Sequence, residues 1–233
     1  MVGVMWWISS NPWVRDDPDS HGISEQDSSR LGGFIIAVGY IVFALLSSYQ
    51  FLPSNELSQG FVSPLVSPQS LVLWGLIAMV GMWDDFVSNI TASGRLALVS
   101  IFSLLWVVIT PGALQLEAFA WLPGPLANEA VLAIACAFII TAFVNAGNMA
   151  DGANGLLSGI CLAFFVFTFF EVSSQNIFAI IMALTIFIFF NVATGKIFLG
   201  DFGSYGLSSG VAMTALVLYG TAEYTMWCLA SIV

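Results

Sequence analysis

The chain is dominated by long apolar stretches that short polar or Gly- and Pro-rich segments separate. Each stretch approaches the roughly 20 residues that an α-helix needs to cross a bilayer, and the stretches lack the period-2 alternation of a membrane β-barrel. The pattern predicts an all-α fold, a polytopic transmembrane helix bundle with about seven spans. The predicted spans are residues 34–52, 66–83, 96–110, 130–145, 156–170, 176–194 and 206–227.

The composition supports a membrane location for the whole chain. Of the 233 residues, 59% are hydrophobic and 8% are charged, whereas soluble domains carry about 25% charged residues. Because apolar runs recur from end to end, we expect a single integral membrane domain over residues 1–233. Within it, residues 1–33 are expected to be a cytoplasmic or interfacial segment and residues 34–227 the transmembrane bundle.

Counting the spans places four polar segments on one side of the membrane. Two predicted spans lie between each of these segments and the next, so all four emerge on the same face. They contain, in chain order, His21, the Asp84-Asp85 pair, Asp151 and Asp201. The four basic residues fall on that face as well: Arg15, Arg30, Arg95 and Lys196. The positive-inside rule therefore predicts that the active-site loops face the cytoplasm.

The charge balance of this face indicates a metal ion. The chain has a formal net charge of −10, and nine acidic residues accompany the four basic ones on the predicted cytoplasmic side. Such a surface repels anionic substrates unless a cation intervenes, and a divalent cation is the simplest remedy. The adjacent carboxylates of Asp84 and Asp85 repel each other in the same way. The structural alternative for this pair is a helix end that reaches water.

Residues 145–155 join two predicted spans and are unusually polar for a connecting loop. They contain three asparagines, one aspartate and three glycines. Asn145, Asn148 and Asp151 are spaced three residues apart, so they would share one face if the preceding helix continued. A purely structural loop does not need these side chains, which favours a binding role.

Residues 195–206 form a glycine-rich segment before the last predicted span. The segment contains Lys196, Phe198, Asp201 and Ser204 among four glycines. Glycines allow backbone amides to approach a phosphate, and the start of the following helix points its positive end at the same place. We add Lys196 to the candidate site as a cation that faces phosphate.

Together these segments resemble the polyprenyl-phosphate N-acetylhexosamine-1-phosphate transferases. That family includes the enzyme that starts lipid-linked peptidoglycan precursor synthesis and relatives that start O-antigen, enterobacterial common antigen and teichoic acid linkage units. The match consists of ordered motifs with the right number of spans between them, over nearly the whole chain. The motifs are Asp17-Pro18 with His21, Arg30-Leu31-Gly32-Gly33, Gly81-Met82-Trp83-Asp84-Asp85, residues 145–156 and residues 198–204.

The resemblance implies a reaction in a bacterial inner membrane. The phosphate of a polyprenyl phosphate attacks the β-phosphorus of a UDP-amino sugar, giving polyprenyl-diphosphate-sugar and UMP, with Mg²⁺ (or Mn²⁺) as cofactor. It further implies that Asp201 is the main metal ligand with Asp84, and that Asp84 and Asp85 hold or activate the lipid phosphate. The remaining substrate-binding residues that it implies are His21, Asn148, Asp151, Asn154, Phe198 and Ser204.

The sequence also departs from the family pattern. Members usually have ten or eleven spans and a late cytoplasmic loop with a histidine-rich motif, whereas His21 is the one histidine here. We therefore expect either a truncated transferase or a shortened variant, and its activity is left open. Asn154 stands where many relatives have Asp. The alternatives are a transporter or channel, whose binding groups typically lie near the bilayer midplane, and an inactive fragment. Nucleic acid is not an expected partner, and a homodimer is left open.

Overall fold

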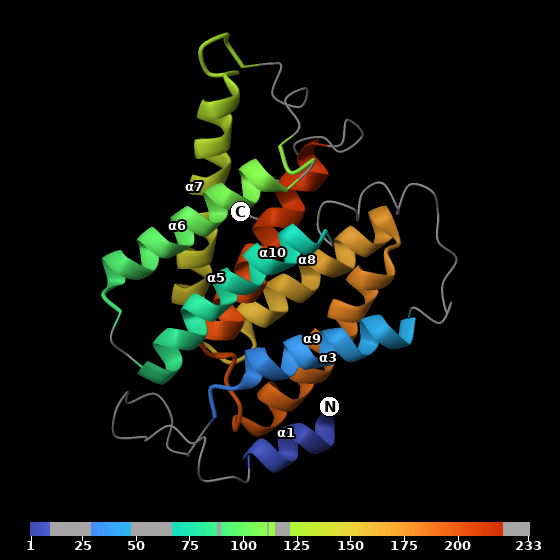
Figure 1. Cartoon of the computed structure of the whole chain (residues 1–233). Helices are drawn as coiled ribbons and strands as arrows, with labels where there is room; N and C mark the ends of the chain where they lie inside the picture. Colours follow the sequence, from blue (N-terminus) through green and yellow to red (C-terminus); the bar gives the residue numbers. More distant parts are fainter. Residues whose placement is uncertain (10–28, 48–66, 88–89, 111, 115–121, 221–233) are drawn as a thin grey trace.

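The computed structural model describes residues 1–9, 29–47, 67–87, 90–110, 112–114 and 122–220, and these residues form an all-α structure (Figure 1). This confirms the predicted fold class for the described part of the chain, where the one β-type contact is an isolated parallel bridge between Ser29 and Ile197. The helices are α1 (Val2–Ser9), α3 (Gly32–Ser47), α5 (Pro68–Val87), α6 (Ala92–Ile109), α7 (Glu129–Ala150), α8 (Leu156–Val172), α9 (Gln175–Thr194) and α10 (Gly200–Gly220).

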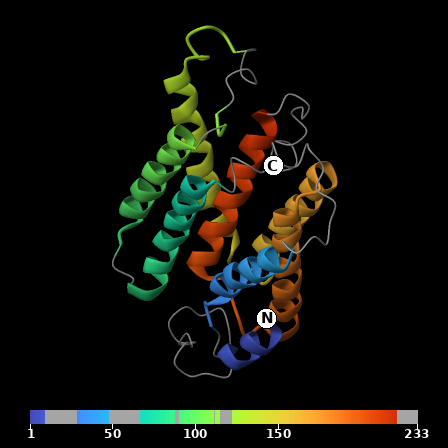
Figure 2. The same cartoon turned by 45° about the vertical axis from the view of Figure 1, so that its right-hand side comes forward.

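Helix α10 lies at the centre of the bundle and contacts α3, α5, α7 and α8. Figure 2 shows it in red, with α5, α6 and α7 in green and yellow on one side and α3, α8 and α9 in blue and orange on the other. Its residues from Gly203 to Leu218 are almost all buried, and apolar side chains such as Val211 and Leu218 belong to the main hydrophobic core. Residues at its start can therefore meet side chains from both halves of the bundle.

The chain is a helical membrane protein with apolar spans. Three described helices, α6, α7 and α9, are long and apolar enough to cross a bilayer, and residues 32–43 of α3 together with α8 form shorter apolar helices. Three of the seven predicted spans thus correspond to helices that are long and apolar enough to cross a bilayer. The number of spans beyond these three stays a prediction, as does the orientation.

Four helices extend further than the hydrophobic pattern predicted, and each extension carries polar site residues. Helix α6 begins at Ala92, four residues before the predicted start, and so includes Arg95. Helix α5 continues to Val87, so the Asp84-Asp85 pair lies in its last turn. Helix α7 continues to Ala150 and includes Asn148. Helix α10 begins at Gly200, six residues before the predicted start, which places Asp201 in its first turn. Hydropathy predicts where the apolar part of a helix ends. The helix itself can continue into polar sequence, as it does here.

Most other helix ends follow local sequence signals. The Thr91 hydroxyl accepts a hydrogen bond from the Gly94 N–H at the start of α6, and the Asn128 side chain accepts one from the Ala130 N–H at the start of α7. Such caps satisfy amides that a helix start otherwise leaves unpaired. Helix α9 ends at Gly195, which has a φ of 62° in the left-handed region that favours glycine.

Close helix crossings around α10 depend on glycine. A Cβ atom at Gly81 of α5 would overlap the carbonyl oxygen of Asp201, and one at Gly33 of α3 would overlap the backbone of Gly203. On α7, a Cβ at Gly147 would overlap the hydroxyl of Ser208. Small residues are typical of helix interfaces in membranes, where attraction between helices depends on close packing. Helices α5 and α3 therefore approach the backbone of α10 near its beginning, and α7 packs closely against the side chain of Ser208 further along.

Residues 29–33 pair with the segment between α9 and α10. The Ser29 N–H donates to the Lys196 carbonyl (3.0 Å) and the Phe198 N–H donates to the Ser29 carbonyl (2.7 Å). The N–H groups of Gly32 and Gly33 then donate to the carbonyls of residues 198 and 199, at 2.9 and 2.7 Å. The Arg30-Leu31-Gly32-Gly33 motif thus holds the chain that leads into α10.

The crossing of α5 and α10 can be tested by adding one methyl group. We expect Gly81→Ala to lower the free energy of unfolding by about 1–3 kcal/mol, because overpacking a tight interface forces the helices apart. The measurement is chemical or thermal unfolding of the purified protein in detergent. Gly75→Ala in the same helix is the matched control, since no atom lies within 4 Å of a Cβ there. Equal stability of the two variants would contradict the tight crossing.

Candidate functional site

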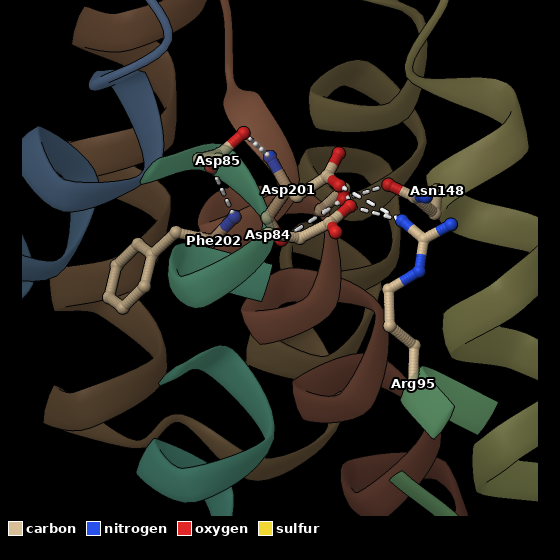
Figure 3. Close-up of polar contacts among 7 residues, drawn as sticks. Asp84, Asp85, Arg95, Asn148, Asp201 and Phe202 are labelled. Atoms are coloured by element: carbon tan, nitrogen blue, oxygen red, sulfur yellow. Dashed lines mark hydrogen bonds and ion pairs between the residues drawn. The ribbon is translucent and has the colours of Figure 1, made fainter. Parts of the chain in front are cut away.

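Side chains from three of the four predicted polar segments meet at the beginning of α10, and the segment with His21 lies outside the described residues. Figure 3 shows the side chains of Asp84 and Asp85 from the end of α5, Asn148 from α7 and Asp201 from α10 in one group. Arg95, from the first turns of α6, enters the same group. Residues that lie far apart along the chain thus form one polar site at one end of the bundle, as the count of spans predicted.

Asp84 and Asp201 form a pair that Arg95 bridges. The Arg95 guanidinium donates a hydrogen bond to Asp84 Oδ2, and the same nitrogen lies 3.7 Å from Asp201 Oδ2 (Figure 3). A hydrogen bond also links the side chains of Asp84 and Asp201. The side chains of Asp84 and Asp201 are 16% and 28% exposed, so the pair is partly shielded from water but accessible to a ligand.

Burial and mutual repulsion make negative charge costly in this site. Burial, the side-chain hydrogen bond that protonated Asp201 donates to Asp84 and the charges of Asp85 and Asp84 together raise the pKa of Asp201 to about 7, although Arg95 acts in the opposite direction. Burial and the charges of Asp201 and Asp85 raise the pKa of Asp151 to about 8. A raised carboxyl pKa means that the ionised form lacks sufficient positive charge nearby. An added cation would supply that charge.

Asp85 is directed differently from Asp84. Its Oδ1 accepts a hydrogen bond from the Asp201 backbone N–H (3.1 Å), and its Oδ2 accepts one from the Phe202 N–H (3.0 Å) (Figure 3). Burial raises the pKa of Asp85, and these two amide bonds oppose the increase. Both carboxylate oxygens therefore accept amide hydrogen bonds from the start of α10, and a direct contact between Asp85 and a lipid phosphate stays a prediction.

Ser204 and Asn148 form a second polar contact between helices. The Ser204 hydroxyl donates to Asn148 Oδ1 at 2.7 Å and lies 3.2 Å from the Asp201 carbonyl oxygen. Ser204 is fully buried, so its hydroxyl orients the Asn148 amide and is not open to a ligand. Oδ1 of Asn148 is the acceptor in this contact, which leaves the amide NH₂ group as a donor for another partner.

The other predicted site residues lie around this centre. Asp151 follows α7 directly and donates its backbone N–H to the Gly147 carbonyl. Asn154 and Lys196 are exposed, and Phe198 is partly buried and held by its backbone next to residues 29–33. Asn154 also approaches Gly195, where a Cβ would lie 3.9 Å from Asn154 Nδ2. His21 lies outside the described residues, so its predicted role is not tested.

Sequence analysis missed three residues of the site. Arg95 was used to orient the protein in the membrane and was not placed among the acidic residues, although it occurs in the same set of loops. Together with Tyr205, Arg95 lines a polar pocket between α6 and α7 that includes Asn145 and Asn148. Asn191, buried at the end of α9, donates from Nδ2 to the Ile197 carbonyl at 2.6 Å and so fixes the segment before α10. No motif signalled Tyr205 or Asn191.

The carboxylate pair fits a magnesium ion in part. Within the described ranges, no group of three or more His, Cys, Asp or Glu side chains is arranged to hold a metal by itself. Mg²⁺ in phosphoryl-transfer sites is commonly bound by one or two carboxylates with substrate phosphates and water completing the octahedron. Asp84 and Asp201 supply such a two-carboxylate, all-oxygen set, and their unfavourable negative charge is what a divalent cation would relieve.

The fold and the site define a class of protein: a helical membrane protein whose acidic site lies at one end of its bundle. Residues 68–220, more than half of the chain, match glycosyl transferase family 4, and the chain belongs to that family. The matched region begins with α5 and ends with α10, so it contains every described site residue except the segment at Ser29 and Arg30. The predicted family resemblance is confirmed.

Curated relatives extend the match toward the N-terminus. The chain is 27% identical over 225 residues to the phospho-N-acetylmuramoyl-pentapeptide-transferase of Levilactobacillus brevis, which covers 88% of this chain and 66% of the relative. The enzymes of the same name from Bacillus thuringiensis and Bacillus cereus are each 26% identical over 88% of this chain and 65% of their own length. The chain thus spans slightly less than two thirds of these relatives.

Removing the Arg95 charge tests whether the carboxylate pair can bind a divalent cation. We expect Arg95→Gln to bind Mn²⁺ about tenfold more tightly in the absence of substrates, because a positive charge within 4 Å of both carboxylates opposes a second cation. The measurement is Mn²⁺ titration followed by electron paramagnetic resonance. Lys196→Gln removes an exposed positive charge from the neighbouring loop and serves as the control. Weaker binding in Arg95→Gln would show that the pair is not the metal site.

Proposed function

We propose that this chain transfers a sugar-1-phosphate from a UDP-sugar to a polyprenyl phosphate and releases UMP. N-acetylhexosamine-1-phosphate is the group to be tested first. An oxygen of the lipid phosphate attacks the β-phosphorus of the UDP-sugar, and the bond from that phosphorus to the bridging oxygen of UMP breaks. The product, polyprenyl-diphosphate-sugar, would start a lipid-linked polysaccharide of the bacterial cell envelope. Family membership and the similarity to phospho-N-acetylmuramoyl-pentapeptide-transferases support this reaction class.

The observation that carries the proposal is the Asp84–Asp201 pair with Arg95 between the two carboxylates. Phosphoryl transfer depends chiefly on positioning and on neutralising charge at the transferred group. Bound Mg²⁺, held by Asp84 and Asp201, would neutralise phosphate charge there. Arg95 is placed to donate hydrogen bonds to a phosphate oxygen that approaches the pair, because guanidinium binds phosphate in a fork geometry.

Asp84 is better suited to position the lipid phosphate than to act as a strong base. A phosphate monoester has a second pKa of about 6 and is largely dianionic at neutral pH, so it needs no deprotonation. In the structure, the Asp84 carboxylate accepts a hydrogen bond from Arg95, so it already has a partner that holds it in place beside Asp201. We therefore assign to Asp84 the orientation of the nucleophile and the metal.

The nucleotide end of the donor would lie beside α7 and the loop before α10. Asn148 offers its amide NH₂ group, and Asp151, Asn154 and Phe198 surround the same end of the bundle. Lys196 is exposed in this loop and available to a diphosphate. These are proposed contacts, with Ser204 acting through Asn148. The proposal also places the site on the cytoplasmic side of the membrane, where UDP-sugars are found.

Labelling of the lipid tests the proposed reaction. Membranes that contain the chain are incubated with polyprenyl phosphate, Mg²⁺ and a radiolabelled donor, using UDP-N-acetylglucosamine and the donor of the phospho-N-acetylmuramoyl-pentapeptide group in parallel. We expect labelled lipid that disappears on chelation of Mg²⁺ and falls at least about a hundredfold in Asp201→Asn, since electrostatic groups at the reacting centre contribute factors of this size.

Glu129→Gln is the matched control because Glu129 begins α7 at the end of that helix remote from Asn148 and Asp151. It should leave labelling unchanged. Failure of the unmodified chain to label lipid from either donor would reject the proposal for this chain. Uptake of solute into sealed vesicles without lipid labelling would indicate a transporter instead.

A further inference from the structure

The two adjacent aspartates of α5 contact different parts of α10. Consecutive residues of a helix point about 100° apart, so neighbouring carboxylates are directed toward different surroundings. Here α5 stays helical through Val87, and Asp84 and Asp85 diverge. The Asp84 side chain meets the side chains of Asp201 and Arg95, whereas the Asp85 side chain meets the backbone N–H groups of Asp201 and Phe202.

The start of α10 needs an acceptor that its own sequence does not provide. The first amides of a helix have no partner within the helix, and a Ser, Thr, Asp or Asn just before the first turn usually accepts from them. In α10 the residue before the helix is the apolar Leu199, and the first residue is Gly200, which has a φ of 73° and no side chain. A Cβ at Gly200 would overlap the Arg30 carbonyl and lie 3.0 Å from Asp85 Oδ2. The cap therefore comes from α5, across the helix interface.

We propose that Asp85 is a positioning residue, whose carboxylate caps α10 and thereby holds Asp201 at a fixed distance from Asp84. The two aspartates of α5 act together: Asp85 holds the backbone of Asp201, and Asp84 meets its side chain. The end of α5 thus fixes the position of the Asp201 backbone and also provides the partner of the Asp201 carboxylate. Gly81, one turn earlier on α5, lets the backbones approach closely enough for this arrangement.

The remaining contacts around the start of α10 agree with this role. The N–H groups of Gly32 and Gly33 hold the carbonyls of Phe198 and Leu199, and Asn191 holds the carbonyl of Ile197. These bonds fix the chain before Gly200 through its carbonyl groups. The Asp85 bonds fix the chain after Gly200 through its amides. With both in place, Asp201 has little freedom to move away from the pair with Asp84.

The proposal is tested by amide hydrogen exchange, Mn²⁺ binding and turnover of the same variants. In Asp85→Ala we expect amides of the peptide covering residues 200–205 to exchange at least about fivefold faster, the factor that corresponds to a lost helix cap. Exchange in α7 should not change. Mn²⁺ affinity should fall severalfold per folded molecule, a change that partial unfolding alone does not produce.

Asp85→Asn keeps one carbonyl oxygen as acceptor and one of the two bonds, so its exchange and its Mn²⁺ affinity should lie between those of the unmodified protein and Asp85→Ala. It also provides a second variant if the alanine protein does not fold. In the lipid-labelling assay, which rests on the proposed function, both variants should lose kcat with little change in the KM for polyprenyl phosphate. Glu129→Gln again serves as the control.

Unchanged exchange over residues 200–205 in Asp85→Ala would overturn the cap. Faster exchange with unchanged Mn²⁺ affinity would show that the cap does not position Asp201. A higher KM for polyprenyl phosphate with unchanged Mn²⁺ affinity would assign Asp85 to the lipid phosphate instead. If the unmodified chain labels no lipid, the proposed function fails by itself, while exchange and Mn²⁺ binding still decide the role of Asp85.

Discussion

Negative charge that is withdrawn from water must be matched by donors or cations, and this constraint governs the organisation of the bundle around α10. At one end of a largely apolar protein, Asp84 is hydrogen-bonded to the side chain of Asp201, and Asp85 is hydrogen-bonded to the backbone N–H of Asp201. The amides at the start of α10 satisfy Asp85, and Arg95 satisfies Asp84. Asp201 and Asp151 are left with insufficient positive charge, and their pKa values rise accordingly. The acids are thus only partly compensated, and the remaining negative charge is the feature that a metal or a phosphate-bound cation would use.

The motifs that resemble the transferase family divide into residues for chemistry and residues for spacing. Gly81 and Gly33 bring α5 and α3 into backbone contact with α10, and residues 29–33 hold the segment that precedes it. In a bilayer, where lipid tails are as apolar as leucine, close packing of small residues is a main source of attraction between helices. A glycine next to a functional aspartate in these motifs therefore has a physical reason of its own. It sets the distance at which the aspartate on one helix meets the backbone of the next.

The position of Arg95 can be explained by membrane topology or by a role in the site. The positive-inside rule treats it as a marker of the cytoplasmic side, yet the structure pairs it with Asp84 and places it within 4 Å of Asp201. A base that the site requires would lie beside the acids in either orientation, so it is not independent evidence for topology. Arg30 also lies beside Asp85 in the pocket between α3, α5 and α10. The predicted orientation consequently depends more on Arg15 and Lys196 than on the full count of four basic residues.

The sequence by itself determined the all-α membrane class, because apolar length is a property of the chain alone, and the parity of its spans brought acidic and amide residues to one end of the bundle. The resemblance of its motifs indicated the family. The sequence did not determine that α5, α7 and α10 continue beyond their apolar runs, since whether a polar residue extends a helix depends on partners from other helices. It could not separate Asp84 from Asp85, which are adjacent in sequence and chemically identical. Only the tertiary structure decided that Asp84 faces Arg95 and Asp201 while Asp85 caps α10, because this difference depends on how α5 packs against α10, where Gly81 meets the backbone of Asp201.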